Sequence, residues 1–324
     1  MTVKLENIDC PLGCAKNDEI VLTGRDRLHD LPGEFTVVKC RSCGLMRTSP
    51  RPTPGTMGFY YPDNYGPYLG TQVKRREPTH LSTFKDQVKS LIHHFIDFNT
   101  MVLPPLEPGR MLELGCASGV FLYRMANLGW DVQGIEFSGT AAKMAADLGY
   151  SVHAGPLETA PKPDGVFDLI VGWMVLEHLH DPVGGLKKLR EWAKPDAWLV
   201  LSVPNAASLE FRLFKQRWYA LQLPTHLYHF TPQSMGQLLE SCGWKLEKVH
   251  HQRILSNLIA SMGYVLRDKG FGKFGQMLID VPEGSAWWPY LLYPLAWIFS
   301  LFGQTGRMTV WARPVNNSTI EASS

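Results

Sequence analysis

The chain has 324 residues, of which 45% are hydrophobic and 19% are charged, and its formal net charge at pH 7 is +2. This length allows one large α/β domain and a smaller module, each able to bury a core. A net charge this small excludes a chain-wide basic field, so nucleic acid is not the expected partner. Residues 1–7 (MTVKLEN) lack the apolar core of a secretion signal, and we therefore expect a cytoplasmic protein.

Four of the six cysteines lie as two close pairs near the N-terminus, Cys10 with Cys14 and Cys40 with Cys43. In an unsecreted chain this pattern favours a metal site over disulfides. Four thiolates can close a tetrahedral zinc site, and glycine or proline beside each pair lets the backbone curl around the ion. Closed sites of this kind are structural, so we assign the ion no chemistry. Four unrelated buried thiols are the alternative.

A zinc-ribbon-like module with a proline- and tyrosine-rich extension is predicted for residues 1–75. Residues 34–39 alternate in polarity as a strand does, and this strand would deliver the second cysteine pair. The extension is too rich in proline for a regular helix. Its tyrosines, among them Tyr60, Tyr61 and Tyr65, either pack on the main domain or line a substrate cleft.

A linker and an amphipathic helix are predicted for residues 76–105, because apolar residues recur at helical spacing from 81 to 103. Pro104 and Pro105 end this helix. We place the main domain at residues 106–315, with an apolar insertion at about 280–304. A flexible polar tail is predicted at residues 316–324.

A strand, a glycine turn and a helix open the main domain. The apolar run 111–114 stops at Gly115, Gly119 follows, and a helical pattern starts at Val120. The glycines allow the backbone to approach a ligand closely, and the helix start offers it unpaired N–H groups. The Gly-x-x-x-Gly spacing differs from the dinucleotide fingerprint and from the Walker phosphate loop.

A second strand, residues 131–136, ends in Glu136. A carboxylate at this distance from the glycine turn suits the two ribose hydroxyls of a nucleoside cofactor, because it has paired acceptors for a diol. NAD-binding folds use the same device, so Glu136 alone does not identify the cofactor. Further strands are predicted at residues 150–153, 166–173, 197–204 and 307–313.

Several stretches together carry a family resemblance. The motifs are LELGCASG (112–119), FDLIV (167–171) followed by LEHLHDP (176–182), and SVPN (202–205) in the main domain, and CRSCGLMRTSPRPT (40–53) followed by YYPDNYGPY (60–68) in the N-terminal module. They resemble class I S-adenosylmethionine (SAM) methyltransferases with an N-terminal four-cysteine zinc-binding module. These are similar to the bacterial glycan, lipid and ubiquinone/menaquinone biosynthesis branch.

The resemblance implies an α/β fold with a Rossmann-like seven-stranded sheet, SAM as the cofactor and a structural Zn²⁺. It implies methyl transfer, most often to oxygen or carbon, on a small-molecule, sugar or lipid-linked acceptor. It also implies that the helix before residue 105 covers the sheet edge. Residues that would contact the cofactor are Glu113, Gly115, Cys116, Ala117, Ser118, Gly119, Glu136, Phe137, Pro156, Leu157, Trp173, Met174 and Glu177. Ala117 stands where the family more often has glycine, but it is small enough to preserve the close approach.

Two histidines are the candidate catalytic groups. His226 lies in a Pro-x-His segment followed by Phe-Thr-Pro, which matches the family pattern residue for residue. His178 lies in LEHLHDP, and a capping or packing role is its alternative. A base is needed only if the acceptor is a hydroxyl or an acidic carbon. His180 is expected at the surface.

The segment 285–303 carries no charge over its whole length. Pro289 and Pro294 interrupt it, and the strand predicted after it argues against a membrane span. We expect a helix in the membrane interface, with tryptophan and tyrosine anchors and a basic flank at residues 245–273, at the inner face of the membrane. A lid packed on the protein or on a second copy in a homodimer is the alternative.

Two other functions share part of the pattern. A dinucleotide oxidoreductase would also use Glu136, but its third glycine is missing here and LEHLHDP has no place in that fold. An RNA methyltransferase could use the zinc module as its reader, but the module's charge is too balanced for a strong phosphate-binding surface. A non-catalytic SAM-fold scaffold is the third alternative.

Overall fold

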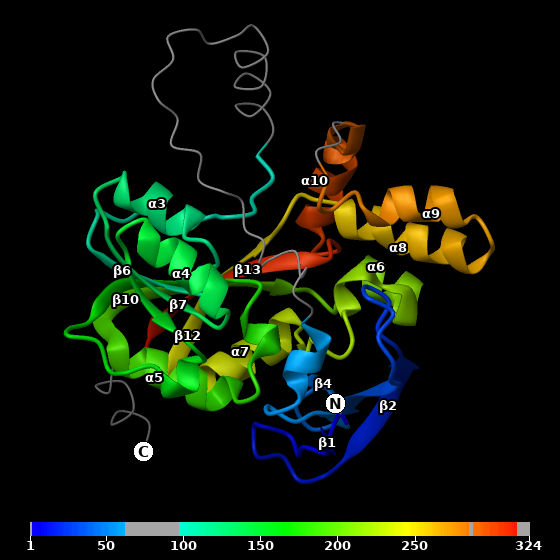
Figure 1. Cartoon of the computed structure of the whole chain (residues 1–324), viewed down its shortest axis with the longest axis horizontal. Helices are drawn as coiled ribbons and strands as arrows, with labels where there is room; N and C mark the ends of the chain where they lie inside the picture. Colours follow the sequence, from blue (N-terminus) through cyan, green and yellow to red (C-terminus); the bar gives the residue numbers. More distant parts are fainter. Residues whose placement is uncertain (1, 62–96, 285–287, 316–324) are drawn as a thin grey trace, which may run out of the picture.

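A computed structural model describes residues 2–61, 97–284 and 288–315 (Figure 1). A seven-stranded sheet forms its centre, and the strand order is β12-β13-β10-β9-β6-β7-β8. The five strands from β10 to β8 run parallel, whereas β13 is antiparallel to β10 and to β12. In this order the strands are β12 (Trp244–His251), β13 (Arg307–Pro314), β10 (Ala193–Pro204), β9 (Phe167–Trp173), β6 (Arg110–Leu114), β7 (Asp131–Glu136) and β8 (Ser151–Ala154). This confirms the Rossmann-like sheet predicted from the sequence.

Helices cover both faces of the sheet, and this explains why β9 and β10 are nearly continuous apolar runs. Figure 1 shows α3 and α4 on one face and α5 and α7 on the other. The helices are α3 (Val120–Ala126), α4 (Gly139–Asp147), α5 (Pro182–Trp192), α6 (Leu209–Phe214), α7 (Pro232–Ser241), α8 (Ser256–Asp268), α9 (Gly272–Ile279) and α10 (Tyr293–Leu301). Side-chain caps define several starts: Ser138 for α4, Asp181 for α5 and Thr231 for α7.

Short 3₁₀ turns connect these elements. They are η1 (Met57–Tyr60), η2 (Leu157–Thr159), η3 (Leu176–His178), η4 (Lys215–Arg217), η5 (Tyr219–Leu221) and η6 (Trp288–Leu292). Among them η3 directly follows β9, so it lies at the carboxyl edge of the sheet, next to the ends of β6 and β10. That edge is where ligands bind in open α/β sheets.

The N-terminal module shares a sheet with the main domain. Its strands are β1 (Leu5–Glu6), β2 (Asp18–Gly24), β3 (Phe35–Cys40), β4 (Met46–Thr48) and β5 (Arg51–Pro52). The four-stranded sheet has the order β11-β4-β3-β2, and β11 (Tyr228–His229) comes from the segment between β10 and α7. This pairing was not predicted from the sequence, and it anchors the module beside His226.

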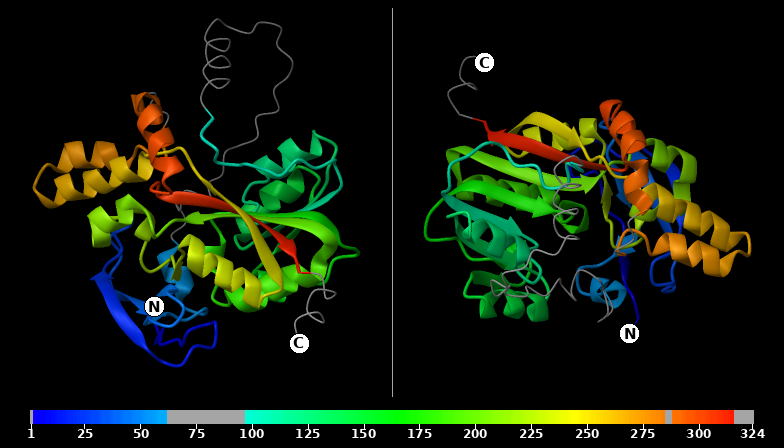
Figure 2. Two further views of the ribbon diagram at one scale, coloured as in Figure 1. Left: turned by 180° about the vertical axis from the view of Figure 1, so that it is seen from behind. Right: turned by 90° about the horizontal axis from the view of Figure 1, so that it is seen from above.

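Helices α8, α9 and α10 extend from the main sheet on the side away from α3 and α4, as both views of Figure 2 show. Helices α8 and α9 pack backbone against backbone, because a Cβ on Gly263 would lie 2.6 Å from the carbonyl oxygen of Gly275. The apolar segment forms η6 and the nine-residue α10. Within the described parts of the chain, no helix is both long enough and apolar enough to span a membrane.

Some predictions fall outside the described residues. The helix predicted at 81–103 lies mostly in the gap 62–96, as does Tyr65, and residues 285–287 and the tail 316–324 are also outside. The end of this helix was wrong, because residues 97–103 are described and are not helical. The other predicted strands occur within a few residues of the expected ends; the strand predicted at 197–204, for example, begins earlier, at Ala193.

Candidate functional site

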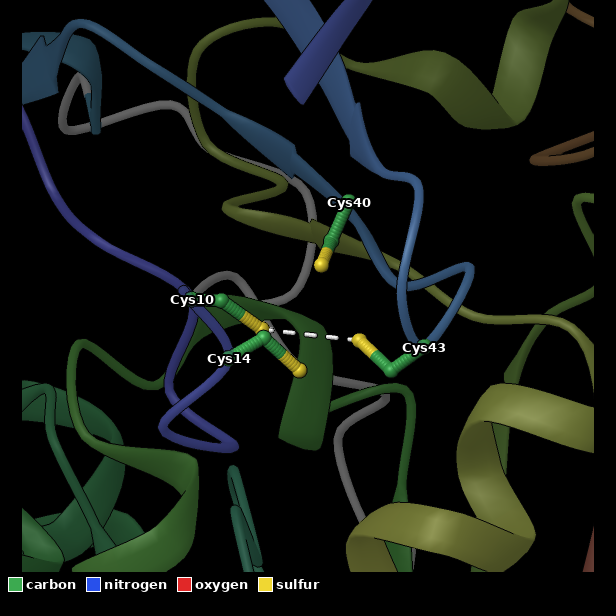
Figure 3. Close-up of side chains that lie close together, drawn as sticks. All are labelled: Cys10, Cys14, Cys40 and Cys43. Atoms are coloured by element: carbon green, nitrogen blue, oxygen red, sulfur yellow. Dashed lines mark hydrogen bonds between the residues drawn. The ribbon is translucent and has the colours of Figure 1, made fainter. Parts of the chain in front are cut away.

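The four N-terminal cysteines converge, as Figure 3 shows. Cys10 and Cys14 lie between β1 and β2, Cys40 ends β3, and Cys43 lies in the turn that follows. Their sulfur atoms all lie within 4.8 Å of one another, and Sγ of Cys10 is 3.5 Å from Sγ of Cys43. A tetrahedral Zn²⁺ with bonds of about 2.3 Å separates its sulfurs by about 3.8 Å, so the donor set fits this ion.

The local backbone favours the thiolate of one member of this cluster, Cys40, whereas burial raises the pKa values of Cys14 and Cys43. Burial opposes ionisation of Cys40, but backbone N–H groups of Cys43 and Ser42 bring its pKa down to about 7. The turn after Cys40 is closed by the N–H of Gly44, which donates to the carbonyl of Cys40 at 2.8 Å. A thiolate is the form that binds a metal ion.

The glycine turn after β6 is tightly packed against the neighbouring strand ends. Gly115 and Gly119 have φ values of 71° and 81°, which favour glycine. The N–H of Gly115 donates to the carbonyl of Ile135 at 2.8 Å, and a Cβ on Gly115 would collide with the side chain of Val175. Ala117 also has a positive φ of 45°, so the position at which the family more often has glycine does adopt the left-handed region.

Two buried carboxylates flank this turn. Glu136 accepts hydrogen bonds from the N–H groups of Ala117 and Ser138 at 2.9 and 2.8 Å. Glu113 is buried on β6, and its Oε2 has no hydrogen-bond partner among the described residues. Burial and the nearby Glu136 raise the pKa of Glu113 well above its usual range. A cationic group of a ligand would satisfy this orphaned oxygen, so the turn fits a cofactor that carries an ammonium.

The other predicted cofactor contacts surround this edge in different environments. Cys116 and Ser118 are buried in the turn, whereas the side chain of Phe137 is 61% exposed. Pro156 precedes η2, and Leu157 is buried in the core. After β9, Trp173 packs edge to face with Phe121 at 5.3 Å between ring centroids, and its buried Nε1 has no partner among the residues described; Met174 has a positive φ of 57°.

A second cluster joins Glu177, His178 and His226, and one potential ligand atom from each lies within 4.8 Å of the others. Glu177 and His178 belong to η3, and His226 lies in the segment between η5 and β11. The backbone brings the two segments together, because the N–H of Leu227 donates to the carbonyl of Glu177 at 2.8 Å. The rings of His178 and His226 meet at 83° with 4.7 Å between their centroids.

The hydrogen bonds of the two histidines define their tautomers. Nδ1 of His178 lies 2.9 Å from the carbonyl oxygen of Thr225, and Nδ1 of His226 lies 2.9 Å from the carbonyl oxygen of Ala220. A carbonyl oxygen only accepts, so each Nδ1 carries the proton and donates it. Both Nε2 atoms therefore keep a free lone pair, provided that the rings are neutral.

Burial keeps both rings neutral. It lowers the pKa of His178 to about 4, and together with the nearby His178 and His229 it lowers the pKa of His226 well below the usual value. Burial acts on Glu177 in the opposite direction and raises its pKa to about 8, against the attraction of Arg307. Glu177 is completely buried (0% exposed), and neither carboxylate oxygen has a partner in the part of the chain that is described.

The N-terminal module contributes to this cluster, which the sequence did not predict. Oη of Tyr61 lies 2.9 Å from Nδ1 of His178, and the hydroxyl of Thr48 donates to the carbonyl of His226 at 2.8 Å. Arg51 donates to the carbonyl of His180 at 3.1 Å. Nε2 of His180 donates to the carbonyl of Pro52, so His180 is half-buried at this contact and not a surface residue. No spacing in the sequence links residues so far apart.

A buried arginine was also missed. Arg307 begins β13, its pKa is lowered by burial, and it is attracted by Tyr219, Glu210 and Glu177. One of its Nη atoms donates to Oδ1 of Asn257 at 3.0 Å, and its buried Nε has no partner among the described residues. Its place at the start of an apolar strand was the only available signal.

Comparison with known proteins matches this arrangement to one family. Residues 84–249 match the sequence profile of a family described as methyltransferase domain. The chain is 31% identical over 132 residues to a ubiquinone biosynthesis O-methyltransferase of Burkholderia ambifaria, and the match covers 37% of this chain and 56% of that protein. It is 26% identical over 159 residues to one of Thiobacillus denitrificans, covering 45% and 68%. The chain thus spans little more than half the length of the first of these relatives.

Solved structures give looser likenesses. A SAM-dependent methyltransferase of Mesorhizobium loti is 16% identical with a TM-score of 0.42, and the match covers 65% of this chain and 93% of that one. A putative SAM-dependent methyltransferase of Listeria monocytogenes is 16% identical with a TM-score of 0.44, covering 70% and 100%.

Proposed function

This chain belongs to the methyltransferase domain family, and we propose that it transfers the methyl group of SAM to a hydroxyl or acidic carbon of a small-molecule, sugar or lipid-linked acceptor. The observation that carries the proposal is the meeting of two features at one sheet edge. These are the glycine turn with Glu113 and Glu136 at the ends of β6 and β7, and the cluster of Glu177, His178 and His226 after the adjacent β9.

In this proposal the protein mainly aligns donor and acceptor, since the sulfonium already activates the methyl group. Glu113 binds the ammonium of SAM, and the glycine turn receives its backbone at close range. Glu136, which already accepts two backbone N–H groups, lies where the ribose hydroxyls would approach. The acceptor gives its proton to His226 or His178 and forms a bond to the methyl carbon. The bond between that carbon and the sulfur breaks, and its electron pair stays on the sulfur.

O-methylation is the favoured reaction. The relatives from Burkholderia ambifaria and Thiobacillus denitrificans are named ubiquinone biosynthesis O-methyltransferases. Two neutral imidazoles with free Nε2 lone pairs suit the removal of a proton from a hydroxyl. An amine acceptor would need no such group.

Calorimetric titration of the full chain with SAM and with NADPH tests the cofactor. We expect one SAM per chain and no NADPH binding; NADPH binding without SAM binding would identify the oxidoreductase alternative.

Methyl-labelled SAM incubated with a cell extract, with and without ribonuclease, tests the acceptor class. We expect ribonuclease-resistant label in small molecules or lipids, and label confined to RNA would overturn the proposal.

We also propose that the cysteine cluster holds a structural Zn²⁺ and that α9 and α10 lie against an anionic membrane surface. Large apolar side chains are exposed on both helices, and two exposed lysines lie with them, Lys269 before α9 and Lys273 on it. The exposed apolar residues are Phe271, Phe274, Met277, Leu291, Leu295, Trp297, Ile298, Leu301 and Phe302.

Flotation with anionic and with uncharged vesicles tests the membrane contact. Wild type is expected to float with anionic vesicles, and Leu301→Ser with Phe302→Ser should remove most of this binding. Ile20→Ser is the matched control, because Ile20 is 73% exposed on β2 of the N-terminal module. A concentration-dependent dimer that the double variant dissociates, with no flotation, would instead assign this face to a second copy of the chain.

A further inference from the structure

Glu177 has an electrostatic problem that the protein alone does not solve. As a carboxylate it is fully buried, and its own backbone N–H and the charge of Arg307 offset this burial only in part. As a neutral acid its O–H has no acceptor among the described residues. Either form leaves a buried polar group unsatisfied, which normally costs about 1 to 3 kcal/mol or more. Burial of such a group without compensation is rare in native proteins and points to an absent ligand.

His178 and His226 are arranged as metal-binding histidines usually are. Each donates its Nδ1–H to a backbone carbonyl, of Thr225 and of Ala220 respectively, and so holds its ring with the Nε2 lone pair free. Histidines that ligate metals almost always donate their other N–H to such a partner.

The spacing of the three groups allows a common ion. One ligand atom each from Glu177, His178 and His226 lies within 4.8 Å of the others. Donors at about 2.1 Å from a cation lie about 3 to 4 Å apart, so a small rotation of the side chains would close the set. Arg307 is the nearby positive charge, and Glu210 also attracts it, so Arg307 does not depend on Glu177 alone.

We infer that Glu177, His178 and His226 form a site for a divalent transition-metal ion, distinct from the four-cysteine cluster. Two imidazoles and one carboxylate are a donor set for Zn²⁺, Mn²⁺ or Fe²⁺. The four thiolates, in contrast, select softer ions such as Zn²⁺. Mn²⁺ therefore distinguishes the two sites within one protein.

The consequence for catalysis rests on the proposed function. Three protein ligands leave coordination positions open for an acceptor hydroxyl, and a bound cation lowers the pKa of that hydroxyl. The hydroxyl proton then passes to water, and an oxygen lone pair forms the bond to the methyl carbon. The carbon–sulfur bond breaks, and its electron pair stays on sulfur as S-adenosylhomocysteine. The ion would thus replace the direct proton transfer to His226 and His178 given under the proposed function, with the two histidines as its ligands and the methyl transfer unchanged.

The test is a titration with Mn²⁺ of the full chain loaded with one Zn²⁺ per chain, enough for the four thiolates only, without SAM or acceptor; the electron paramagnetic resonance signal of free Mn²⁺ follows the binding. We expect one Mn²⁺ per chain in wild type and at least tenfold weaker binding in Glu177→Gln and in His226→Gln. Glu177→Gln replaces the carboxyl group by an amide of nearly the same shape, so it is expected to fold, and circular dichroism checks this.

His180→Gln is the matched control, because His180 lies two residues after η3, is half-buried and is outside the cluster. Its Mn²⁺ affinity should equal that of wild type. Absence of Mn²⁺ binding to wild type, or equal binding by Glu177→Gln and wild type, would overturn the inference. SAM titration of the same samples separates this outcome from a failure of the proposed function, since metal binding is measured without the cofactor.

Discussion

Oη of Tyr61 lies 2.9 Å from Nδ1 of His178, so the N-terminal module contacts the main domain at a candidate catalytic residue. The module is therefore more than a separate unit. Its strand β4 pairs with β11 directly after His226, and Thr48 donates to the carbonyl of His226 itself. Both segments that carry the histidine cluster are thus held by the first 61 residues.

Tyr61→Phe is expected to slow methyl transfer about two- to tenfold without changing SAM affinity. The variant loses one polar contact, worth about 0.5 to 1.5 kcal/mol, at His178, a residue that the proposed function assigns to the acceptor and not to the cofactor. Turnover at saturating SAM and a SAM binding titration measure the two quantities.

Tyr60→Phe is the control for that prediction. Tyr60 is the adjacent tyrosine, and its hydroxyl donates to the carbonyl of Pro32 within the module, at 2.7 Å. Its removal should lower stability by about 1 kcal/mol and leave turnover unchanged. Equal losses of turnover in both variants would mean that Tyr61 acts only through the stability of the module.

The sequence predicted the parts of the structure that have a strong local signal. Apolar runs identified the five parallel strands, and the motifs around Glu113, Glu136 and Glu177 predicted residues that lie along one sheet edge. Strand β11, in contrast, has two residues, too few for any periodicity, and its partner β4 has three. The same holds for the contact of Tyr61 with His178, which depends on tertiary packing and leaves no trace in local spacing.

The cysteine cluster was predictable for a different reason. A metal site imposes residue type and spacing on the sequence, so the spacing of Cys10, Cys14, Cys40 and Cys43 is enough to group them. Arg307 belongs to no such site, so neither a residue type nor a spacing in the sequence marks its role. Its position at the start of β13 looks like an ordinary exposed strand end until packing places it close to Glu210 and Glu177.

Glu113→Gln is expected to stabilise the ligand-free protein and to weaken SAM binding about 10- to 100-fold. In wild type Oε2 of Glu113 is buried without a partner among the described residues, so the neutral amide relieves a cost in the absence of ligand. The same change removes a charge-assisted hydrogen bond of about 1.5 to 3 kcal/mol to the cofactor ammonium. Thermal unfolding with increasing SAM measures both effects.

Glu107→Gln controls for loss of a carboxylate, because Glu107 is exposed just before β6. It should change neither quantity. A Glu113→Gln protein that binds SAM as tightly as wild type would contradict the assigned role of Glu113, whatever its melting temperature.

Cys40→Ser is expected to lower the zinc content by one ion per chain and to loosen the backbone around His226 as well as the module. The N–H of Thr48 donates to the carbonyl of Leu227 at 2.9 Å, so disorder in β4 would release β11. Binding of structural zinc and folding of its site are one equilibrium. Hydrogen exchange should therefore accelerate at Thr48 and His229, whereas Leu199 in the centre of the main sheet stays protected. Unchanged zinc content would contradict the zinc assignment.

Glu210→Gln is expected to stabilise the protein increasingly as pH rises from 5 to 8. Glu210 is buried on α6, where it accepts from Nε1 of Trp218 at 3.3 Å and from the N–H of Gly306 at 3.2 Å. Burial raises its pKa to about 7, although these donors and the charge of Arg307 oppose the shift. Between about pH 4.5 and 7 the folded wild type thus holds a proton that the unfolded chain releases, so its free energy of unfolding falls with pH.

Glutamine at this position does not titrate, so the free energy of unfolding of the variant does not fall with pH for this reason. At about 1.4 kcal/mol per pH unit, the difference between variant and wild type should grow by roughly 2 to 3 kcal/mol across the window. Urea unfolding at pH 5, 6, 7 and 8 measures it, and Glu240→Gln, which changes an exposed residue of α7, should show a difference below about 0.5 kcal/mol throughout. A constant difference between Glu210→Gln and wild type would show that Glu210 is ionised over the whole range, held by Arg307.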